Sequence, residues 1–154
     1  MDLSDLLAAD RVFASLHAGS KKQVLQDLAA RASEASGIDA RVIFDALIER
    51  ERLGSTGVGH GIAIPHARLS EMTQLEGFFA RLETSIEFDA VDDEPVDLVF
   101  LLLVPEESGA DHLKALARIS RLLRNEGVTN TLRNASSADE IYQVLTRPAE
   151  SHAA

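Results

Sequence analysis

The segment Val96–Val104 constrains the fold more strongly than any other part of this chain. It is an almost unbroken run of Val, Leu and Phe, without alternation between apolar and polar residues. A strand of this composition is expected where both faces of a sheet are buried. Its apolar part, Leu98–Val104, is about a third of the ~20 residues that span a bilayer, so a membrane helix is not expected. The sequence therefore predicts a central strand in a sheet with helices packed on both faces.

Helical periodicity is found both before and after this strand. Apolar residues recur at the 3.6-residue spacing of an amphipathic helix, and each segment begins with a residue that favours helix N-termini. Ser20 with Gln23, Ser108 with Asp111, and Ser137 with Glu140 have the spacing of capping pairs. The predicted helices run over residues 21–35, from Asp39 to near Leu53, from Ser108 to near Gly127, and from Ser137 to Pro148.

The remaining segments are two shorter strands and a glycine-rich loop. Ile62–Ile64 and Phe78–Leu82 have the β-branched and aromatic residues that are typical of strands. Before the first of them, Gly54–Gly61 contains four glycines, a composition that argues against a stable helix or strand and indicates a loop. We therefore expect one layered α/β domain over residues 1–147, followed by a polar, flexible tail over 148–154.

Composition narrows the classes of function. The chain has 154 residues, 15 Lys and Arg against 25 Asp and Glu for a net charge of −10, and no cysteine. Disulfides, thiolate metal sites and cysteine nucleophiles are thereby excluded. The negative charge and the 5% aromatic content argue against binding to nucleic acid or to an anionic membrane. Because Met1–Asp5 lacks the basic start of a signal peptide, the protein is expected to be cytoplasmic.

Five histidines are the main candidates for chemistry. His17 and His152 are expected to be solvated surface residues. His60 and His66 flank a short predicted strand and are too far apart in extended geometry to chelate one metal. His112 falls in the first turn of a predicted helix, where it is either a surface residue or part of an anion site at the helix N-terminus.

His66 allows two interpretations. Pro65 restricts the backbone before it, and rigid placement suits a nucleophile. Strict strand alternation would place His66 on the face of Ile62 and Ile64, where a satisfied core histidine is expected. Spacing alone leaves these alternatives open. No Walker A, Gly-x-Ser-x-Gly or His-Glu-x-x-His motif occurs, so nucleotide-binding, hydrolase and metalloenzyme classes lack a motif.

The stretch Gly54–Leu69, GSTGVGHGIAIPHARL, resembles the active-site signature of the fructose and mannitol class of IIA proteins of the bacterial phosphoenolpyruvate-dependent phosphotransferase system (PTS). The similarity extends over most of the chain and is greatest to the stand-alone nitrogen-regulatory branch. It implies a PTS IIA type-2 fold, similar to phosphotransferase/anion transport proteins, in which helices flank both faces of a mixed sheet. The other similar segments are Leu3–Leu25, Glu49–Arg52, Pro95–Leu102, Asp111–Leu113 and Leu116–Ala117.

By this resemblance His66 is the phosphorylated histidine. It would accept a phosphoryl group from the phosphohistidine of an HPr-like carrier, which an enzyme I charges from phosphoenolpyruvate. His112 and Arg52 match the family's second active-site histidine and its arginine, which stabilise the phosphoryl group. His60 stands where the family often has Asn, and Ala67 where Gly is frequent. The loop expected to meet phosphate and partner contains Ser55, Thr56, Gly57, Gly59 and Gly61.

These residue types suit phosphoryl transfer. A neutral imidazole is a good nucleophile near pH 7, and its phosphoramidate can pass the group onward, which a serine phosphate would not. Transfer between imidazoles has no polyphosphate leaving group to neutralise. We therefore expect neither a metal nor another cofactor.

Three functions are compatible with these features. The leading hypothesis is a phosphocarrier of a phosphotransferase system that regulates target proteins according to its phosphorylation state. The first alternative is a IIA component that passes phosphate to a sugar-specific IIB partner of a permease. The second, from another class, is a non-catalytic sensor or binding module with an inert His66. The expected partners are an HPr-like carrier and regulatory target proteins, without nucleic acid or membrane insertion.

Overall fold

The computed structural model describes residues 2–147. The predicted tail over 148–154, with His152, and the helix-terminating Pro148 lie outside the described residues. Within residues 2–147, no helix is long and apolar enough to cross a membrane.

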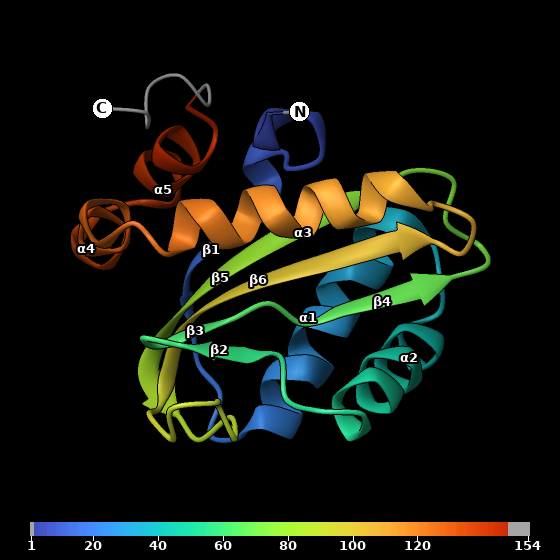
Figure 1. Cartoon of the computed structure of the whole chain (residues 1–154), viewed down its shortest axis with the longest axis horizontal. Helices are drawn as coiled ribbons and strands as arrows, with labels where there is room; N and C mark the ends of the chain where they lie inside the picture. Colours follow the sequence, from blue (N-terminus) through green and yellow to red (C-terminus); the bar gives the residue numbers. More distant parts are fainter. Residues whose placement is uncertain (1, 148–154) are drawn as a thin grey trace.

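A six-stranded mixed sheet forms the centre of the protein (Figure 1). The strands follow the order β1-β5-β6-β3-β2, and β4 pairs with β6 as well. β6 is antiparallel to β5 and parallel to β3 and β4. The strands are β1 (Val12–Leu16), β2 (Gly57–Gly59), β3 (Ile62–Ala63), β4 (His66–Leu69), β5 (Glu76–Ile86) and β6 (Val96–Pro105).

The strand β6 is buried on both faces, as its composition predicts. Every side chain from Leu98 to Val104 is 0% exposed. Because successive strand residues point to opposite faces, they alternate between two separate cores. Val99, Leu101 and Leu103 belong to one core, and Leu98, Phe100, Leu102 and Val104 to the other.

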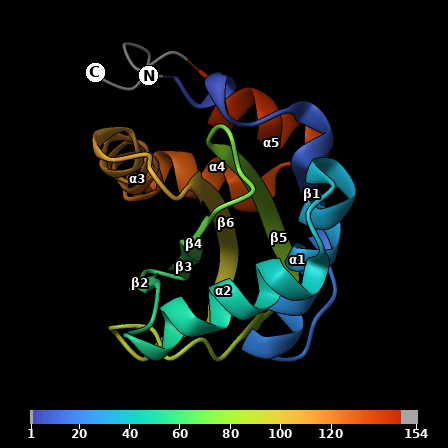
Figure 2. The same ribbon diagram turned by 90° about the vertical axis from the view of Figure 1, so that its right-hand side faces the viewer.

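Helices cover both faces of the sheet, so the predicted layered α/β fold is confirmed (Figure 2). One layer consists of α1 (Lys21–Ser36) and α2 (Ala40–Arg52). The opposite layer consists of α3 (Ala110–Leu123), α4 (Glu126–Asn134) and α5 (Ala138–Leu145), together with the 3₁₀ turns η1 (Leu3–Asp5) and η2 (Ala9–Arg11).

Three predicted helix N-termini are capped as expected, and one is not. Ser20, Asp39 and Ser137 each accept a backbone N–H of the first turn of their helix. The predicted Ser108 cap is wrong, because the N-cap of α3 is Gly109 with φ 54° and ψ −125°. A residue with a Cβ is strained in that conformation, so glycine provides the sharp entry into the helix.

The predicted helix from Ser108 to near Gly127 is two helices in the structure. α3 ends at Leu123, and the side chain of Asn125 accepts the N–H of Val128 at the start of α4. Gly127 therefore lies in the first turn of α4 and does not end a helix. Its backbone N–H has no intrahelical acceptor at that position, so glycine costs less there than in a helix interior.

The glycine-rich segment predicted to be only a loop contains the short strand β2. Gly57 pairs with Ala63 of β3, and a Cβ at Gly57 would lie 2.8 Å from the Cβ of Ala90. The absence of a side chain thus allows two backbone segments to approach closely. Composition alone missed this strand.

β3 and β4 pair with β6 one after the other, and the two short strands are separated by Ile64–Pro65. Ile62 of β3 pairs with Leu98, and His66 of β4 pairs with Leu102 farther along the same strand. The N–H of Leu102 donates to the Pro65 carbonyl at 2.9 Å, so pairing continues past the proline. A proline is tolerated at a sheet edge because it lacks only a donor. His66 therefore begins β4, a separate strand that pairs near the carboxyl end of β6. The sequence predicts only that His66 follows the short strand Ile62–Ile64.

Candidate functional site

His66 is held by a partner on each ring nitrogen. Its Nδ1 lies 2.9 Å from the Ile64 carbonyl oxygen, which can only accept, so Nδ1 carries the proton. The Nε of Arg50 lies 3.2 Å from Nε2, and a guanidinium can only donate, so Nε2 carries the lone pair. The two contacts together select a neutral tautomer with its nucleophilic atom at Nε2.

Burial and nearby charge favour the same neutral form. Desolvation is the main cause that lowers the pKa of His66 below 6.5, and the positive charges of Arg50 and Arg68 lower it further. The hydrogen bond to Ile64 and the charge of Glu51 act in the opposite direction, but the pKa remains lowered. His66 is consequently neutral near pH 7 and is a competent nucleophile there.

His112 is the second group at this site. It lies in the first turn of α3, is only 8% exposed, and its ring centroid is 5.6 Å from that of His66. Burial is the main cause that lowers the pKa of His112, followed by the charges of His66 and Arg68. The structure thus brings His66 and His112 together, and the interpretation of His112 as a solvated surface residue is wrong.

The structure does not place Arg52 at His66, which corrects the expectation that the two converge. The Arg52 side chain is 68% exposed and pairs with Glu49 on the surface of α2. Successive helical residues project about 100° apart, so residues 50 and 52 point in nearly opposite directions. Arg50 is the arginine that contacts His66, and its Nη1 also donates to the Gly54 carbonyl at 2.9 Å.

A sequence signal for Arg50 was present in the phase of its helix. Ile43 and Leu47 mark the buried face of α2, and Arg50 follows them at i+7 and i+3. That face packs beside β4, which begins at His66 (Figure 1). Helical phase therefore selects Arg50, whereas the resemblance was carried over to Arg52.

The start of the glycine-rich loop is fixed by a buried carboxylate. The Glu51 side chain is 5% exposed and accepts the N–H of Thr56 at 3.1 Å and the ammonium of Lys21 at 2.8 Å. It also accepts the Thr56 hydroxyl. Ser55 donates its hydroxyl to the Phe88 carbonyl. The hydroxyls of Ser55 and Thr56 are thus bonded within the protein, where they position the loop.

The far end of the loop is held by Arg133. This guanidinium contacts both carboxylate oxygens of Asp97, at 2.9 and 3.0 Å, and donates to the His60 carbonyl at 2.8 Å. Gly61 has φ 81°, and a Cβ there would lie 2.5 Å from Arg133. His60 is exposed with φ 58°, and its N–H donates to Asp92. No contact between the His60 and His66 rings occurs in the described part of the chain.

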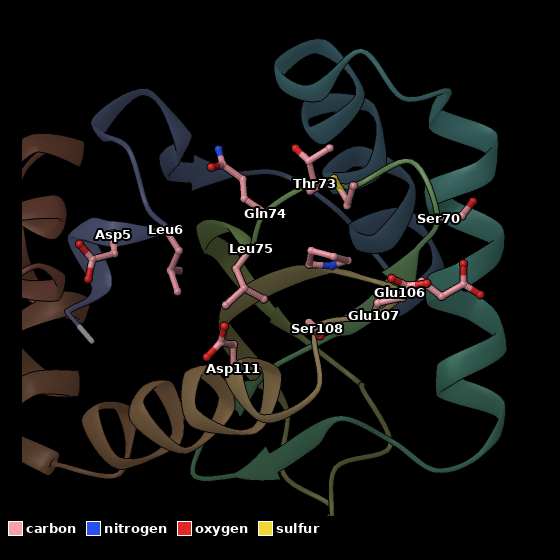
Figure 3. A pocket seen from close by; sticks show the side chains of 12 residues that line it. Asp5, Leu6, Ser70, Thr73, Gln74, Leu75, Glu106, Glu107, Ser108 and Asp111 are labelled. Carbon is pink, nitrogen blue, oxygen red and sulfur yellow. The ribbon is translucent and has the colours of Figure 1, made fainter.

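A cavity of about 910 Å³ with an acidic lining is shown in Figure 3. It is formed by η1, the loop after β4 and the β6–α3 connection. Four carboxylates surround it, from Asp5, Glu106, Glu107 and Asp111, and neither His66 nor His112 lines it. Their negative charge disfavours a phosphoryl group. The cationic edge next to His66 is therefore the better anion site.

The arrangement combines a neutral imidazole nucleophile, a guanidinium on its reactive nitrogen and a second neutral imidazole. Arginine and imidazole N–H groups are suited to offset charge on phosphoryl oxygens. Within residues 2–147, no group of three His, Cys, Asp or Glu side chains is arranged to hold a metal ion.

This fold is that of a IIA-type component of the phosphotransferase system. Residues 5–147 match the family described as "Phosphoenolpyruvate-dependent sugar phosphotransferase system, EIIA 2". The match spans nearly all of the chain, which therefore belongs to this family.

Similar proteins identify the branch of the family. A "Nitrogen regulatory protein" of Bradyrhizobium diazoefficiens is 51% identical over 148 residues, which cover 96% of this chain and 97% of that one. The crystal structure of nitrogen regulatory protein IIA-Ntr from Neisseria meningitidis superposes with a TM-score of 0.90 at 34% identity, over 94% of this chain and 99% of that one. A fructose-specific EIIA component of Haloferax volcanii is 42% identical over 128 residues, which cover 83% of this chain and 82% of that one. The predicted kinship with nitrogen-regulatory IIA proteins is confirmed.

Proposed function

We propose that this protein is a cytoplasmic phosphocarrier in which His66 accepts a phosphoryl group from the phosphohistidine of an HPr-like carrier. The observation that supports it best is the pair of contacts on His66. With Nδ1–H bonded to the Ile64 carbonyl, Nε2 presents a lone pair at a half-buried site with lowered pKa. Membership of the EIIA 2 family supports the same role.

In the proposed step, the Nε2 lone pair of His66 attacks the phosphorus of the donor. The new N–P bond forms as the donor's N–P bond breaks, and the electron pair of that bond returns to the donor imidazole. Arg50 turns from Nε2 to the phosphoryl oxygens and offsets their charge, and His112 donates to them. The proton stays on Nδ1 of His66, where it is donated to the Ile64 carbonyl. This hydrogen bond stabilises the positive charge that the His66 ring gains.

The proposed output is regulation. Phosphorylation adds ~1.5 to 2 negative charges to a site next to Arg50 and Arg68. A target that buries the neutral form of His66 would lose affinity, whereas one that offers Arg would gain it. Relatives named nitrogen regulatory proteins favour this output.

The test is a reconstituted transfer. The protein is incubated with enzyme I, an HPr-like carrier and ³²P-labelled phosphoenolpyruvate, and the product is tested for acid-labile, alkali-stable phosphate. We expect one phosphate per chain, which is absent when the carrier is omitted. Absence of label from a folded protein would instead support the sensor with an inert His66.

A second candidate is delivery of phosphate to a sugar-specific IIB partner. The fructose-specific relative from Haloferax volcanii supports it. The labelled protein is mixed with purified fructose-class and mannitol-class IIB domains, and the label on each is followed over time. Rapid transfer to a IIB domain would favour sugar transport, whereas retention on His66 together with phosphorylation-dependent target binding would favour regulation.

A further inference from the structure

Arg68 lies on the same strand as His66, and its guanidinium contacts His112. It follows His66 by two positions in β4, so both side chains project from the same face of the sheet. That is the face that α3 covers, because β4 residues Ala67 and Leu69 belong to the opposite core. Arg68 is exposed as a residue, yet its guanidinium has two partners. One amino nitrogen donates to the Glu106 carbonyl at 3.1 Å, and the other lies 3.2 Å from Nδ1 of His112.

The contact with Arg68 determines which nitrogen of His112 carries the proton. A guanidinium has N–H donors and no acceptor, so Nδ1 of His112 must accept and must be unprotonated. The proton of the neutral ring is then on Nε2. Among residues 2–147, this buried Nε2 has no hydrogen-bond partner. A buried donor without an acceptor is unfavourable, so its acceptor is expected to arrive with the reacting group.

We propose that Arg68 is a positioning residue of the phosphoryl site, which acts through His112 by holding Nδ1 as an acceptor and so keeping an Nε2–H donor available for a phosphoryl oxygen on His66. The inference rests on the proposed function of His66 and deepens it. The distance of 5.6 Å between the ring centroids leaves the two rings near enough to share one phosphoryl group.

Arg68 has an electrostatic effect on His112 as well. A protonated His112 would have N–H groups on both nitrogens, and its Nδ1–H would face the Arg68 guanidinium. Burial is the main cause that lowers the pKa of His112, followed by the charge of a protonated His66 and the permanent charge of Arg68, both on β4. Loss of the Arg68 charge should therefore raise the pKa of His112.

The first experiment needs no phosphoryl transfer. Long-range ¹H–¹⁵N spectra of the unphosphorylated protein report the protonation of each His112 nitrogen as a function of pH. In the wild type we expect Nδ1 unprotonated and Nε2 protonated at pH 7. In Arg68→Met we expect the pKa of His112 to rise by about half a pH unit or more, and Arg68→Lys should recover part of this change. Arg124→Met, at the far end of α3, is the matched control and should not alter it. An unchanged titration in Arg68→Met would overturn the proposal.

The second experiment is a double-mutant cycle on transfer rate. Arg68→Met should slow transfer to His66 by roughly tenfold, and His112→Gln should also slow it. The rates are measured at pH 8, where His66 is neutral with or without the Arg68 charge. Because Arg68 acts through His112, adding Arg68→Met to His112→Gln should then cause no further loss. An equal loss in both backgrounds would mean that Arg68 contacts the phosphoryl group directly, contrary to the proposal. If the wild type takes up no phosphate, the proposed function fails, and the NMR titration still decides whether Arg68 controls His112.

Discussion

The guanidinium of Arg50 donates to Nε2 of His66 at 3.2 Å, the same nitrogen that carries the nucleophilic lone pair. The contact orients the imidazole, and the arginine charge lowers its pKa, but the guanidinium also occupies the atom that attacks phosphorus in the proposed transfer. A donor phosphoryl group supplies anionic oxygens that compete with Nε2 for the guanidinium. In the proposed transfer, the approach of the donor would therefore release Nε2 and place the arginine where negative charge develops.

This relationship predicts that the two neighbouring arginines of α2 differ in function. Arg50→Lys keeps a positive charge but loses the planar fork of donors, so we expect phosphoryl transfer to slow by roughly 10²-fold with little loss of stability. Arg52→Lys is the matched control, because its side chain is exposed and paired with Glu49. Its rate should stay within about twofold of the wild type. Rapid-quench measurements give the transfer rate of each variant. A larger loss of rate in Arg52→Lys than in Arg50→Lys would place Arg52 in the site instead of Arg50.

The bond between Nδ1 and Ile64 predicts the position of the phosphoryl group. Because Nδ1 keeps its proton, phosphate should attach to Nε2 of His66 and to no other histidine. ¹⁵N spectra of the phosphorylated protein identify the substituted nitrogen. His66→Ala should abolish stable labelling, whereas His60→Ala should preserve it. Phosphate on Nδ1, or label that persists on His60 in His66→Ala, would contradict the assignment.

The sequence could predict the features that depend on local periodicity. The apolar run of β6 was sufficient to predict a sheet buried on both faces, and helical spacing identified α1, α2 and α5. Ser20 and Ser137 were correctly identified as caps because capping is a contact within one turn. The proximity of His66 and His112 was expected from the family resemblance, which assigns both residues to one active site.

Features that depend on pairing across the chain could not be predicted in the same way. β4 is only four residues long, HARL, and its strand conformation comes from pairing with β6 beyond Pro65. β2 depends on the close approach of Gly57 to Ala90, which composition does not reveal. The choice between Arg50 and Arg52 required the helical phase at the last turn of α2, where a shift of two residues reverses the direction of the side chain.

The buried carboxylate beneath the glycine-rich loop predicts a large effect on stability. Glu51→Ala would leave the N–H and hydroxyl of Thr56 and the ammonium of Lys21 without their acceptor. We expect the free energy of unfolding to fall by about 2 kcal/mol or more. Glu49→Ala, two residues earlier on the exposed surface, should change it by less than about 0.5 kcal/mol. Urea unfolding of both variants tests this, and equal effects would show that Glu51 does not anchor the loop.

The lowered pKa values of His66 and His112 predict how stability changes with pH. The unfolded chain binds protons on both rings as pH falls through about 6.5, whereas the folded protein resists protonation to lower pH. Stability should therefore decrease from pH 7.5 to 5.5, and it should be independent of these two groups above that range. The carboxylates whose pKa values are lowered, Glu83, Asp92 and Glu140, have ordinary values of 4.5 or below, so their contribution changes mainly at lower pH.

The measurement is the slope of unfolding free energy against pH between 5.5 and 7.5, obtained from urea titrations. His66→Gln with His112→Gln removes both titrating rings while retaining amide groups, so the slope should become markedly smaller than in the wild type. His17→Gln is the control, because the His17 side chain is 86% exposed and far from this pair in the fold. The comparison depends on slopes, so a uniform loss of stability in the double variant does not affect it. An equal slope in the wild type and the double variant would show that these histidines are not held neutral by the fold.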